Sequence, residues 1–333
     1  MAPTTAPGAV IVMAAGKGTR MRSATPKVLH RIGGRSLLDH AVTAARGLAP
    51  EHLVVVVRHE RDAVVAHLAQ VAPDAVPADQ DDVPGTGRAV ACGLAALPAD
   101  LTGPVVVTSG DVPLLDTATL QDLLTQHEER GDAVTLLTTN LEDPTGYGRV
   151  VREGDGTVSA IVEQRDATPA QQAITEVNAG VYVFDAAHLR TALATLGTDN
   201  DQGEVYLTDV VAHAHGTGLP TSALGVTDHW LVEGCNDRAQ LASLGAELNR
   251  RVLARAMADG VGVVDPTTTW VDVTARWERD VSLEPGVLVR GTTHLGEGAT
   301  VGAYAILTDV EIPAGAVVAP FAQLDRQTSA GQR

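Results

Sequence analysis

The chain has 333 residues, of which 44% are hydrophobic and 20% are charged, so it can bury a sizeable core and is not disordered throughout. Its net charge of −17 argues against binding to nucleic-acid backbones, and its aromatic content of 3% argues against stacking on the bases of single strands. Two cysteines, Cys92 and Cys235, are too few for a disulfide scaffold or a structural zinc site.

Neither a membrane span nor a signal peptide is recognisable. No apolar run approaches the roughly 20 residues that a spanning helix needs. The first apolar run, at 10–15, is too short for the hydrophobic part of a signal peptide, and no basic residue precedes it. The sequence therefore predicts a cytoplasmic protein that has neither a membrane nor a nucleic acid as a partner.

Strand and helix patterns alternate along the first half of the chain. Continuous apolar runs, typical of strands buried on both faces, lie at 9–15, 53–57, 105–108 and 133–138. Helical spacing of apolar residues is found at 36–47, at 87–97 and after Asp116, a suitable N-cap. This alternation predicts an α/β fold with a doubly wound, mostly parallel, Rossmann-like sheet. Any ligand would then lie along the edge where the parallel strands end.

The pattern changes further along the chain. Short strands are predicted at 148–152, 158–163 and 178–184, and a long helix follows Asn236 and ends near Gly260. Beyond about residue 285 an aliphatic residue recurs every six positions, with one unit a residue short, which is typical of a hexapeptide solenoid. The predicted regions are a sheet domain at 1–232, a linking helix at 233–260, a solenoid at 261–325 and a flexible tail at 326–333.

The positive charge near the N-terminus is concentrated in one segment. The only two lysines of the chain, Lys17 and Lys27, flank Arg20 in a glycine-rich stretch that follows the first strand. Glycines let backbone N–H groups approach a phosphate, and the basic side chains can bind its oxygens. The spacing is neither that of a Walker loop nor that of a dinucleotide-binding motif. The segment therefore predicts an anion site, with an ordinary solvated loop as the alternative.

Two further motifs are candidates for binding, and the first of them follows a predicted strand. Asp111, in Gly-Asp-Val-Pro after the third strand, could reach a divalent ion held against phosphates, or could simply belong to a turn. Gln80, with Gly85-Thr86-Gly87, offers an amide suited to the edge of a pyrimidine base and a close backbone approach. The alternative is a loop in which Thr86 caps a helix.

With these motifs in place, the chain resembles the bacterial N-acetylglucosamine-1-phosphate uridylyltransferases, the N-terminal half of the bifunctional GlmU-type enzymes. The resemblance runs from about Val10 to Phe321 and rests on AAGKGTRM, TPKVLH, SGDVPLL, DPTGYGR, IVEQRDAT and EVNAG. It implies a GT-A-like nucleotidyltransferase domain, a helical arm and a short left-handed parallel β-helix. It also implies that UTP and N-acetylglucosamine 1-phosphate react, with Mg²⁺, to give UDP-N-acetylglucosamine for peptidoglycan synthesis, in a homotrimer assembled through the β-helix.

The resemblance assigns roles to residues by position. Nucleotide binding is implied for Met13, Ala14, Ala15, Gly16, Lys27, Gln80, Gly85, Thr86, Ser109 and Gly110. Sugar binding is implied for Gly148, Glu163, Asn178, Tyr206 and Thr208, and Mg²⁺ binding for Asp111 and Asn236. Arg20 and Lys27 are the implied catalytic residues, which would stabilise charge on the α-phosphate and on departing pyrophosphate. Loss of one such cation is expected to cost about 3 kcal/mol or more.

The sequence also departs from the family pattern. Arg88 stands where these enzymes usually have His, Met13 replaces a usual Leu, and Cys235 replaces a usual Val. The further solenoid coils that carry the acetyltransferase residues are absent, so no acetyltransferase activity is expected. One alternative is the same reaction with another NTP or another sugar or cyclitol 1-phosphate. A second is a non-catalytic regulatory or scaffold homologue, which the intact phosphate and metal residues disfavour.

Overall fold

The structure is a computed structural model that describes residues 6–326. Contacts within the chain divide it into two compact units, which we call the sheet unit and the solenoid unit. The sheet unit comprises Met1–His30 and Leu37–Asp237, and the solenoid unit comprises Arg31–Ser36 and Arg238–Arg333. The tail predicted at 326–333 lies, apart from Arg326, outside the described residues.

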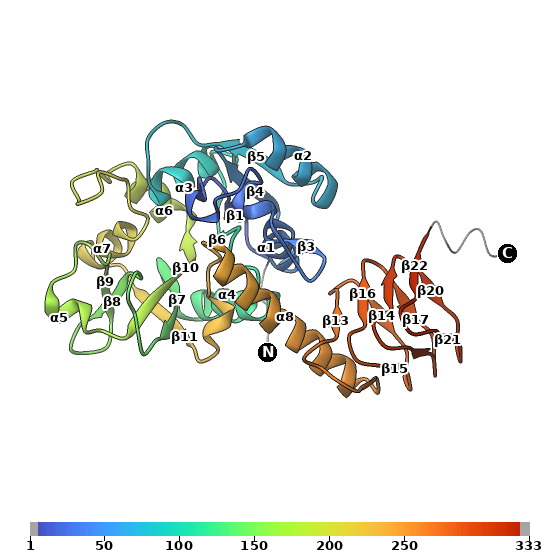
Figure 1. Cartoon of the computed structure of the whole chain (residues 1–333). Helices are drawn as coiled ribbons and strands as arrows, with labels where there is room; N and C mark the ends of the chain where they lie inside the picture. The colour runs from blue at the N-terminus through green and yellow to red at the C-terminus, as the bar shows by residue number, and fades with distance from the viewer. Residues whose placement is uncertain (1–5, 327–333) are drawn as a thin grey trace. The chain divides into compact units, whose positions relative to one another are not determined.

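The described part of the sheet unit contains a nine-stranded sheet (Figure 1). Its main path runs in the order β11-β7-β10-β6-β1-β4-β5, and β8 and β9 are attached beside β10. The strands are β1 (Ala9–Met13), β4 (His52–Val57), β5 (Val76–Asp79), β6 (Pro104–Ser109), β7 (Val134–Asn140), β8 (Arg149–Arg152), β9 (Val158–Val162), β10 (Glu176–Asp185) and β11 (Thr221–Val226). Strand β1 is parallel to β4 and β6, whereas β10 is antiparallel to β6 and β7.

Helices cover both faces of this sheet (Figure 1). Along β1, Val10 and Val12 point to one face and Ile11 to the other, and all three are fully buried. One face packs against α1 (Leu37–Arg46), α2 (Arg61–Val71) and α4 (Thr117–Arg130), and the other against α3 (Thr86–Ala95), α6 (Ala186–Leu193) and α7 (Asp209–Gly216). The predicted doubly wound α/β fold is confirmed. No helix in residues 6–326 has the length and apolarity needed to cross a membrane.

Helix α4 shows why the local sequence folds as it does. Its N-cap is Asp116, as predicted, and the Asp116 carboxylate accepts a hydrogen bond from the Thr119 N–H at 2.8 Å. Such a cap contributes about 1 kcal/mol. Leu120, Leu123 and Leu124 lie on one face and are fully buried. Capping and helical apolar spacing therefore act together at this site.

Other elements are not predicted by the sequence patterns: α2, β5, α6, α7 and β11. Helix α2 buries two hydrophobic residues, Val64 and Leu68, which lie about one turn apart. The helical spacing of its apolar residues is therefore weak. Strand β5 lies at the edge of the sheet and contains Pro77, which breaks the usual apolar signal. The strand predicted at 9–15 ends at Met13, although the Ala14 N–H still donates to the Val56 carbonyl at 2.8 Å.

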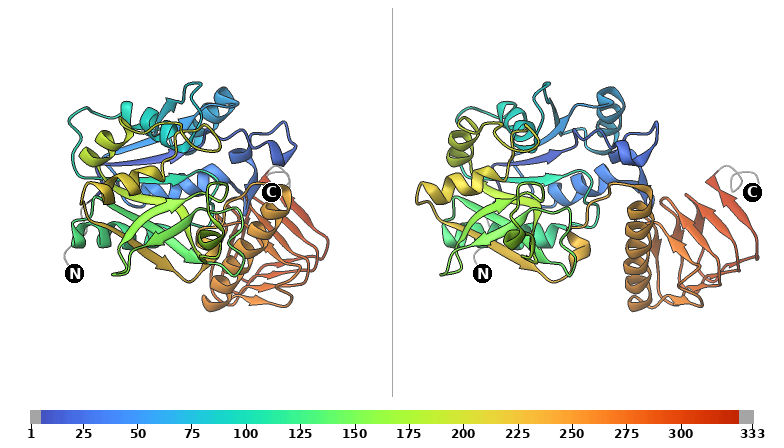
Figure 2. Two further views of the ribbon diagram at one scale, coloured as in Figure 1. Left: turned by 90° about the vertical axis from the view of Figure 1, so that its left-hand side faces the viewer. Right: turned by 60° about the vertical axis from the view of Figure 1, so that its left-hand side comes forward.

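The solenoid unit combines a hairpin, a long helix and stacked short strands (Figure 2). The hairpin is β2 (Arg31–Ile32) with β3 (Arg35–Ser36), and the helix is α8 (Arg238–Ala258). The short strands are β12 (Gly262–Val263), β13 (Trp270–Val271), β14 (Arg276–Trp277), β15 (Ser282–Leu283), β16 (Leu288–Arg290), β17 (His294–Leu295), β18 (Thr300–Val301), β19 (Ile306–Thr308), β20 (Glu311–Ile312), β21 (Val317–Val318) and β22 (Gln323–Asp325). They stack as three parallel sets, which confirms a short β-helix.

The six-residue repeat has a direct structural counterpart. Leu288 pairs with Ile306, 18 positions on, and Ile306 pairs with Gln323, 17 positions on, so the short unit falls in the last coil. The recurring aliphatic residues point inward and are at most 1% exposed: Leu283, Val289, Leu295, Val301 and Leu307. The first strand of the solenoid, β12, lies within the region predicted at 261–325, although the regular six-residue recurrence is recognisable only beyond about residue 285.

Candidate functional site

A cavity of about 390 Å³ lies in the sheet unit where β1, β4, β5 and β6 end. We call it the edge cavity. Nine of the ten residues with an implied nucleotide role line it: Met13, Ala14, Ala15, Gly16, Lys27, Gln80, Gly85, Thr86 and Ser109. The tenth, Gly110, lies behind the lining, where its N–H donates to the Met13 carbonyl at 2.8 Å. A Cβ at Gly110 would stand 3.3 Å from Leu38, so glycine permits this close packing.

The glycine-rich segment brings Lys27 to the edge cavity. Gly18 has a φ of 62°, and a Cβ there would stand 2.6 Å from the Lys27 Cβ, so a side chain at position 18 would displace the lysine. Lys27 begins a short 3-10 helix, η2 (Lys27–Leu29), and its side chain is 12% exposed. Its Nζ donates to the Asp111 carboxylate and, at 3.4 Å, to Asn236 Oδ1.

Asp111 and Asn236 are 125 positions apart in the sequence but meet at Lys27. Asp111 lies two residues beyond the end of β6, and its carbonyl accepts a hydrogen bond from the Cys235 N–H at 2.8 Å, which places Asn236 next to it. Burial raises the pKa of the Cys235 thiol to about 11, so this neighbour stays neutral. A carboxylate oxygen and an amide oxygen therefore converge on one positive charge. Within residues 6–326, no cluster of three or more His, Cys, Asp or Glu could hold a metal.

Arg20 is not brought to this group. It lies in the single turn of η1 (Thr19–Met21), in which Met21 is buried at 1% exposure and Arg20 is exposed. One turn presents only one side to the core, and the apolar residue takes it. Arg20 consequently lies outside the lining of the edge cavity, whereas Lys17 belongs to that lining.

Sequence reasoning assigned no site role to three other charged or titratable lining residues, Arg58, His59 and Glu204. Arg58 and His59 directly follow β4, so the rule that ligands bind beyond the carboxyl ends of parallel strands could have identified them. Burial, together with the nearby charges of Arg58 and Lys17, lowers the pKa of His59. Glu204 comes from an irregular loop, and no sequence signal marks it.

The loop at 80–86 connects β5 to α3 and forms one wall of the edge cavity. The Gln80 side-chain amide donates to the Val83 carbonyl at 3.1 Å and to the Gly85 carbonyl at 3.2 Å. Gly85 has a φ of 118°, and a Cβ there would stand 2.3 Å from the Val205 carbonyl oxygen. Thr86 does not cap α3; its hydroxyl accepts a hydrogen bond from the Leu207 N–H at 3.1 Å instead. The alternative role of Thr86 as a helix cap is therefore wrong.

The implied sugar-binding residues form a second group in the sheet unit, outside the lining of the edge cavity. The Thr208 hydroxyl donates to Glu163 at 3.4 Å, and the Asn178 N–H donates to the Gly148 carbonyl at 2.9 Å. A Cβ on Gly148 would stand 3.5 Å from a Glu163 carboxylate oxygen. The Tyr206 hydroxyl contacts Asp166 at 3.4 Å. Burial raises the pKa of Glu163, and the nearby Asp166 adds to this effect.

Comparisons with known proteins identify relatives of this chain. The family model of the MobA-like NTP transferase domain matches residues 10–215. The chain is 59% identical over 312 residues to a protein of Kineococcus radiotolerans named "Bifunctional protein GlmU", covering 94% of this chain and 63% of that protein. The proteins of the same name from Micrococcus luteus and Mycolicibacterium gilvum are 55% and 51% identical, with 95% and 97% of this chain and 66% and 69% of theirs covered. The chain thus spans less than two thirds of the length of the first two relatives.

Proposed function

The chain belongs to the GlmU family of nucleotidyltransferases, and from this premise we propose that it transfers the uridylyl group of UTP to N-acetylglucosamine 1-phosphate, releasing pyrophosphate. The observation that carries the proposal is the convergence of Lys27, Asp111 and Asn236 beside the glycine-rich wall of the edge cavity. A triphosphate needs such a combination of positive charge, backbone N–H groups and a cation site. We assign the reaction to the sheet unit, whose segment Leu37–Asp237 contains both Asp111 and Asn236.

The proposed reaction is an in-line displacement at the α-phosphorus of UTP. An oxygen of the sugar phosphate forms the new P–O bond, and the bond to the β-phosphate oxygen breaks. The attacking oxygen is already ionised at neutral pH, so the protein need not supply a general base. Its task is to position the two phosphates and to neutralise the charge that builds on them. Lys27 can do this from the wall of the edge cavity, where it is largely shielded from solvent.

The donor set also suits a divalent cation. Asp111 Oδ2 and Asn236 Oδ1 both face the Lys27 ammonium group, so two oxygens already converge on one positive centre. A carboxylate and an amide oxygen are ligands that Mg²⁺ accepts, with substrate phosphates and waters completing its shell. When bound, Mg²⁺ would neutralise phosphate charge. The phosphates would offer Lys27 a stronger anionic partner than Asp111, which would release the carboxylate for the cation.

The experiment that tests the proposal is pyrophosphate release from UTP, with and without N-acetylglucosamine 1-phosphate and Mg²⁺. We expect release to require all three. Parallel reactions with ATP, GTP, CTP and TTP and with other sugar 1-phosphates determine the substrate range. Absence of pyrophosphate release with UTP and the acetylated sugar would refute the proposal.

Arg20 stays a proposed catalytic residue, and its position sets the size of the expected effect. Because its side chain is exposed, solvent and salt screen its charge, and we expect Arg20→Ala to lower kcat by about tenfold. Steady-state kinetics of the purified variant with both substrates saturating measures this change. A kcat near that of the unmodified chain would remove Arg20 from the catalytic residues.

Glu163 gives a prediction for the sugar side. If its carboxylate accepts a hydrogen bond from the sugar, Glu163→Gln raises KM for N-acetylglucosamine 1-phosphate by about tenfold, with little change in KM for UTP. The pKa of Glu163 lies above the ordinary value, so the acceptor is neutralised as the pH falls through that raised pKa. KM for the sugar phosphate should therefore rise on acidification in the unmodified chain and less so in the variant. Equal pH profiles would contradict the assignment.

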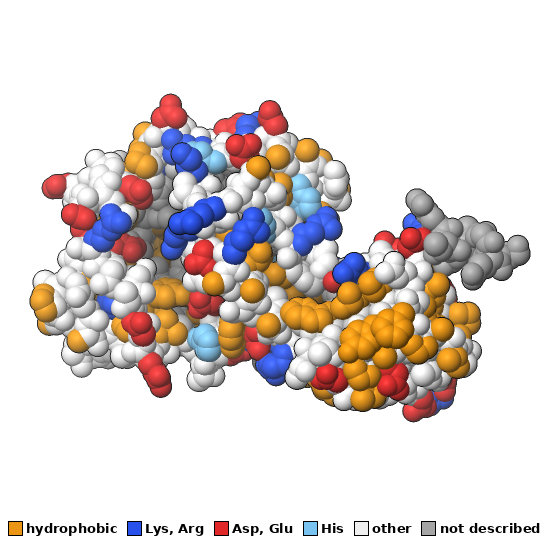
Figure 3. All heavy atoms as spheres, in the orientation of Figure 1, with side chains coloured by type: hydrophobic (Ala, Val, Ile, Leu, Met, Phe, Trp, Pro, Cys, Tyr) orange, Lys and Arg blue, Asp and Glu red, His pale blue; other side chains and the backbone are white. Residues whose placement is uncertain are grey.

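We further propose that the solenoid mediates homotrimer formation. Several large apolar side chains of this unit are exposed: Val264, Trp270, Tyr304, Val317 and Phe321. Figure 3 shows hydrophobic side chains gathered over the solenoid. A protein that consumes UTP works where nucleotides are made, so we place it in the cytoplasm, in the supply of peptidoglycan precursors. The absence of acetyltransferase activity stays a prediction.

A further inference from the structure

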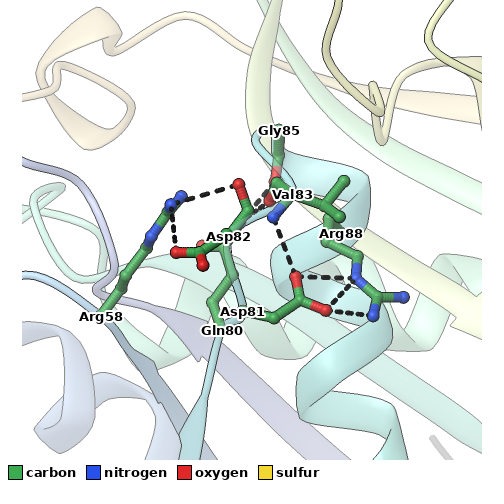
Figure 4. Close-up of polar contacts among 7 residues, drawn as sticks. All are labelled: Arg58, Gln80, Asp81, Asp82, Val83, Gly85 and Arg88. Atoms are coloured by element: carbon green, nitrogen blue, oxygen red, sulfur yellow. Dashed lines mark hydrogen bonds and ion pairs between the residues drawn. The ribbon is translucent and has the colours of Figure 1, made fainter.

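The loop at 80–86 is held by two arginines, Arg58 from the lining of the edge cavity and Arg88 from outside it (Figure 4). Arg88, in the first turn of α3, donates from Nε to both carboxylate oxygens of Asp81, at 3.1 and 3.0 Å, and from Nη2 to one of them. Arg58, just after β4, donates to the Asp82 carbonyl at 3.3 Å and to its carboxylate at 3.5 Å. The two sets of hydrogen bonds come from different elements and bind adjacent residues of the same loop.

The Asp81–Arg88 pair is connected to the wall of the edge cavity through one short chain of hydrogen bonds. Asp81 Oδ1 accepts the Val83 N–H at 3.1 Å, and the Val83 carbonyl accepts the Gln80 side-chain amide at 3.1 Å. The same amide donates to the Gly85 carbonyl at 3.2 Å. Gln80 and Gly85 line the cavity, whereas Arg88 lines a separate groove of about 270 Å³ with Arg190 and Leu94. The Arg88 side chain is therefore connected to the cavity wall through Asp81.

Charge gives a second reason for the pairing. Residues 79–82, at the end of β5 and the start of the loop, carry the carboxylates of Asp79, Asp81 and Asp82 next to the edge cavity, which suits a polyanion. Each has an arginine partner: Arg61 for Asp79, Arg88 for Asp81 and Arg58 for Asp82. The hydrogen bond from Arg88 lowers the pKa of Asp81, so the carboxylate is ionised at neutral pH. Without Arg88, Asp81 would place an uncompensated negative charge beside the nucleotide.

Resting on the function proposed above, we infer that Asp81 and Arg88 are positioning residues for the nucleotide base: their ion pair fixes Gln80 and Gly85 in the conformation that reads uracil. Global stability depends little on this pair, because the two side chains are 44% and 40% exposed. Removal of the Asp81–Arg88 ion pair should therefore change the conformation of the loop at 80–86 while leaving the stability of the fold nearly unchanged.

The test compares Arg88→Ala and Asp81→Asn with the unmodified chain. In each variant we expect KM for UTP to rise about fivefold to tenfold, while kcat and KM for the sugar phosphate change less than about twofold. The preference for UTP over CTP should fall, because a mobile Gln80 discriminates less. Arg88→Lys keeps the charge but loses the bidentate geometry, so its KM should be intermediate. The melting temperature should shift by less than about 2 °C.

Arg61→Ala is the control for the loss of charge alone, because Arg61 donates to Asp79 and Asp62, outside the loop at 80–86, and its removal leaves Asp79 uncompensated at similar exposure. Its KM for UTP should therefore rise less than about twofold. An unchanged KM and UTP/CTP preference in Arg88→Ala, or an equal rise in the Arg61→Ala control, would overturn the inference. If the unmodified chain releases no pyrophosphate, the proposed function is refuted, and the role of the ion pair is tested by binding instead of turnover. Calorimetric UTP binding then decides the role of the pair: weaker binding by the two variants supports it, and equal or undetectable binding by all chains refutes it.

Discussion

Lys27→Met is expected to lower kcat by about a hundredfold to a thousandfold, corresponding to roughly 3–4 kcal/mol of lost transition-state stabilisation. The physical reason is position. The Lys27 side chain is 12% exposed at the wall of the edge cavity, so its charge acts on the phosphates with little solvent screening. Steady-state pyrophosphate release measures the loss, with UTP binding by calorimetry as a second measurement.

Lys17→Met is the natural comparison, because it removes the other lysine of the same cavity. Lys17 is exposed, so the loss in kcat should be much smaller than for Lys27→Met. Lys27→Arg retains the charge in a bulkier group and should recover part of the rate. A Lys27→Met variant that melts normally and keeps more than about a tenth of the unmodified kcat would exclude Lys27 from catalysis.

Asp111→Asn is expected to lower the rate at low magnesium by at least about a hundredfold, because the amide keeps the shape of the side chain but removes the negative charge of the proposed cation site. Raising the magnesium concentration should restore part of the rate if the defect lies in metal affinity. Mn²⁺ binding in the presence of UTP, followed by electron paramagnetic resonance, should weaken in parallel and gives a measurement independent of turnover.

The control for this variant is Asp62→Asn, which removes an almost fully exposed carboxylate on α2 and should change neither measurement. Asp111→Asn also leaves the Lys27 ammonium without its carboxylate partner, so the melting temperature must be measured alongside. Unaltered Mn²⁺ binding in a folded variant would show that Asp111 does not hold the metal.

Much of the fold follows from patterns that are local in sequence. The fully buried valines of β1 and β4 read as continuous apolar runs, and Asp116 marks the start of α4. The solenoid follows from one aliphatic residue every six positions. Periodicity and capping depend only on near neighbours, which is why these elements are recognisable. Helix α2 and strand β5 escape recognition because few of their residues are buried.

From the sequence alone we predict which segments carry the chemistry: the glycine-rich stretch with both lysines, Asp111 in Gly-Asp-Val-Pro, and Gln80 with Gly85-Thr86-Gly87. Which of their side chains contact one another depends on the tertiary structure. Lys27 contacts Asp111 and Asn236, whereas Arg20, seven residues from Lys27, lies exposed outside the cavity lining. Sequence spacing cannot predict this, because contacts between residues 84 and 209 positions apart depend on strand order, and the direction of Arg20 depends on which side of one turn is buried.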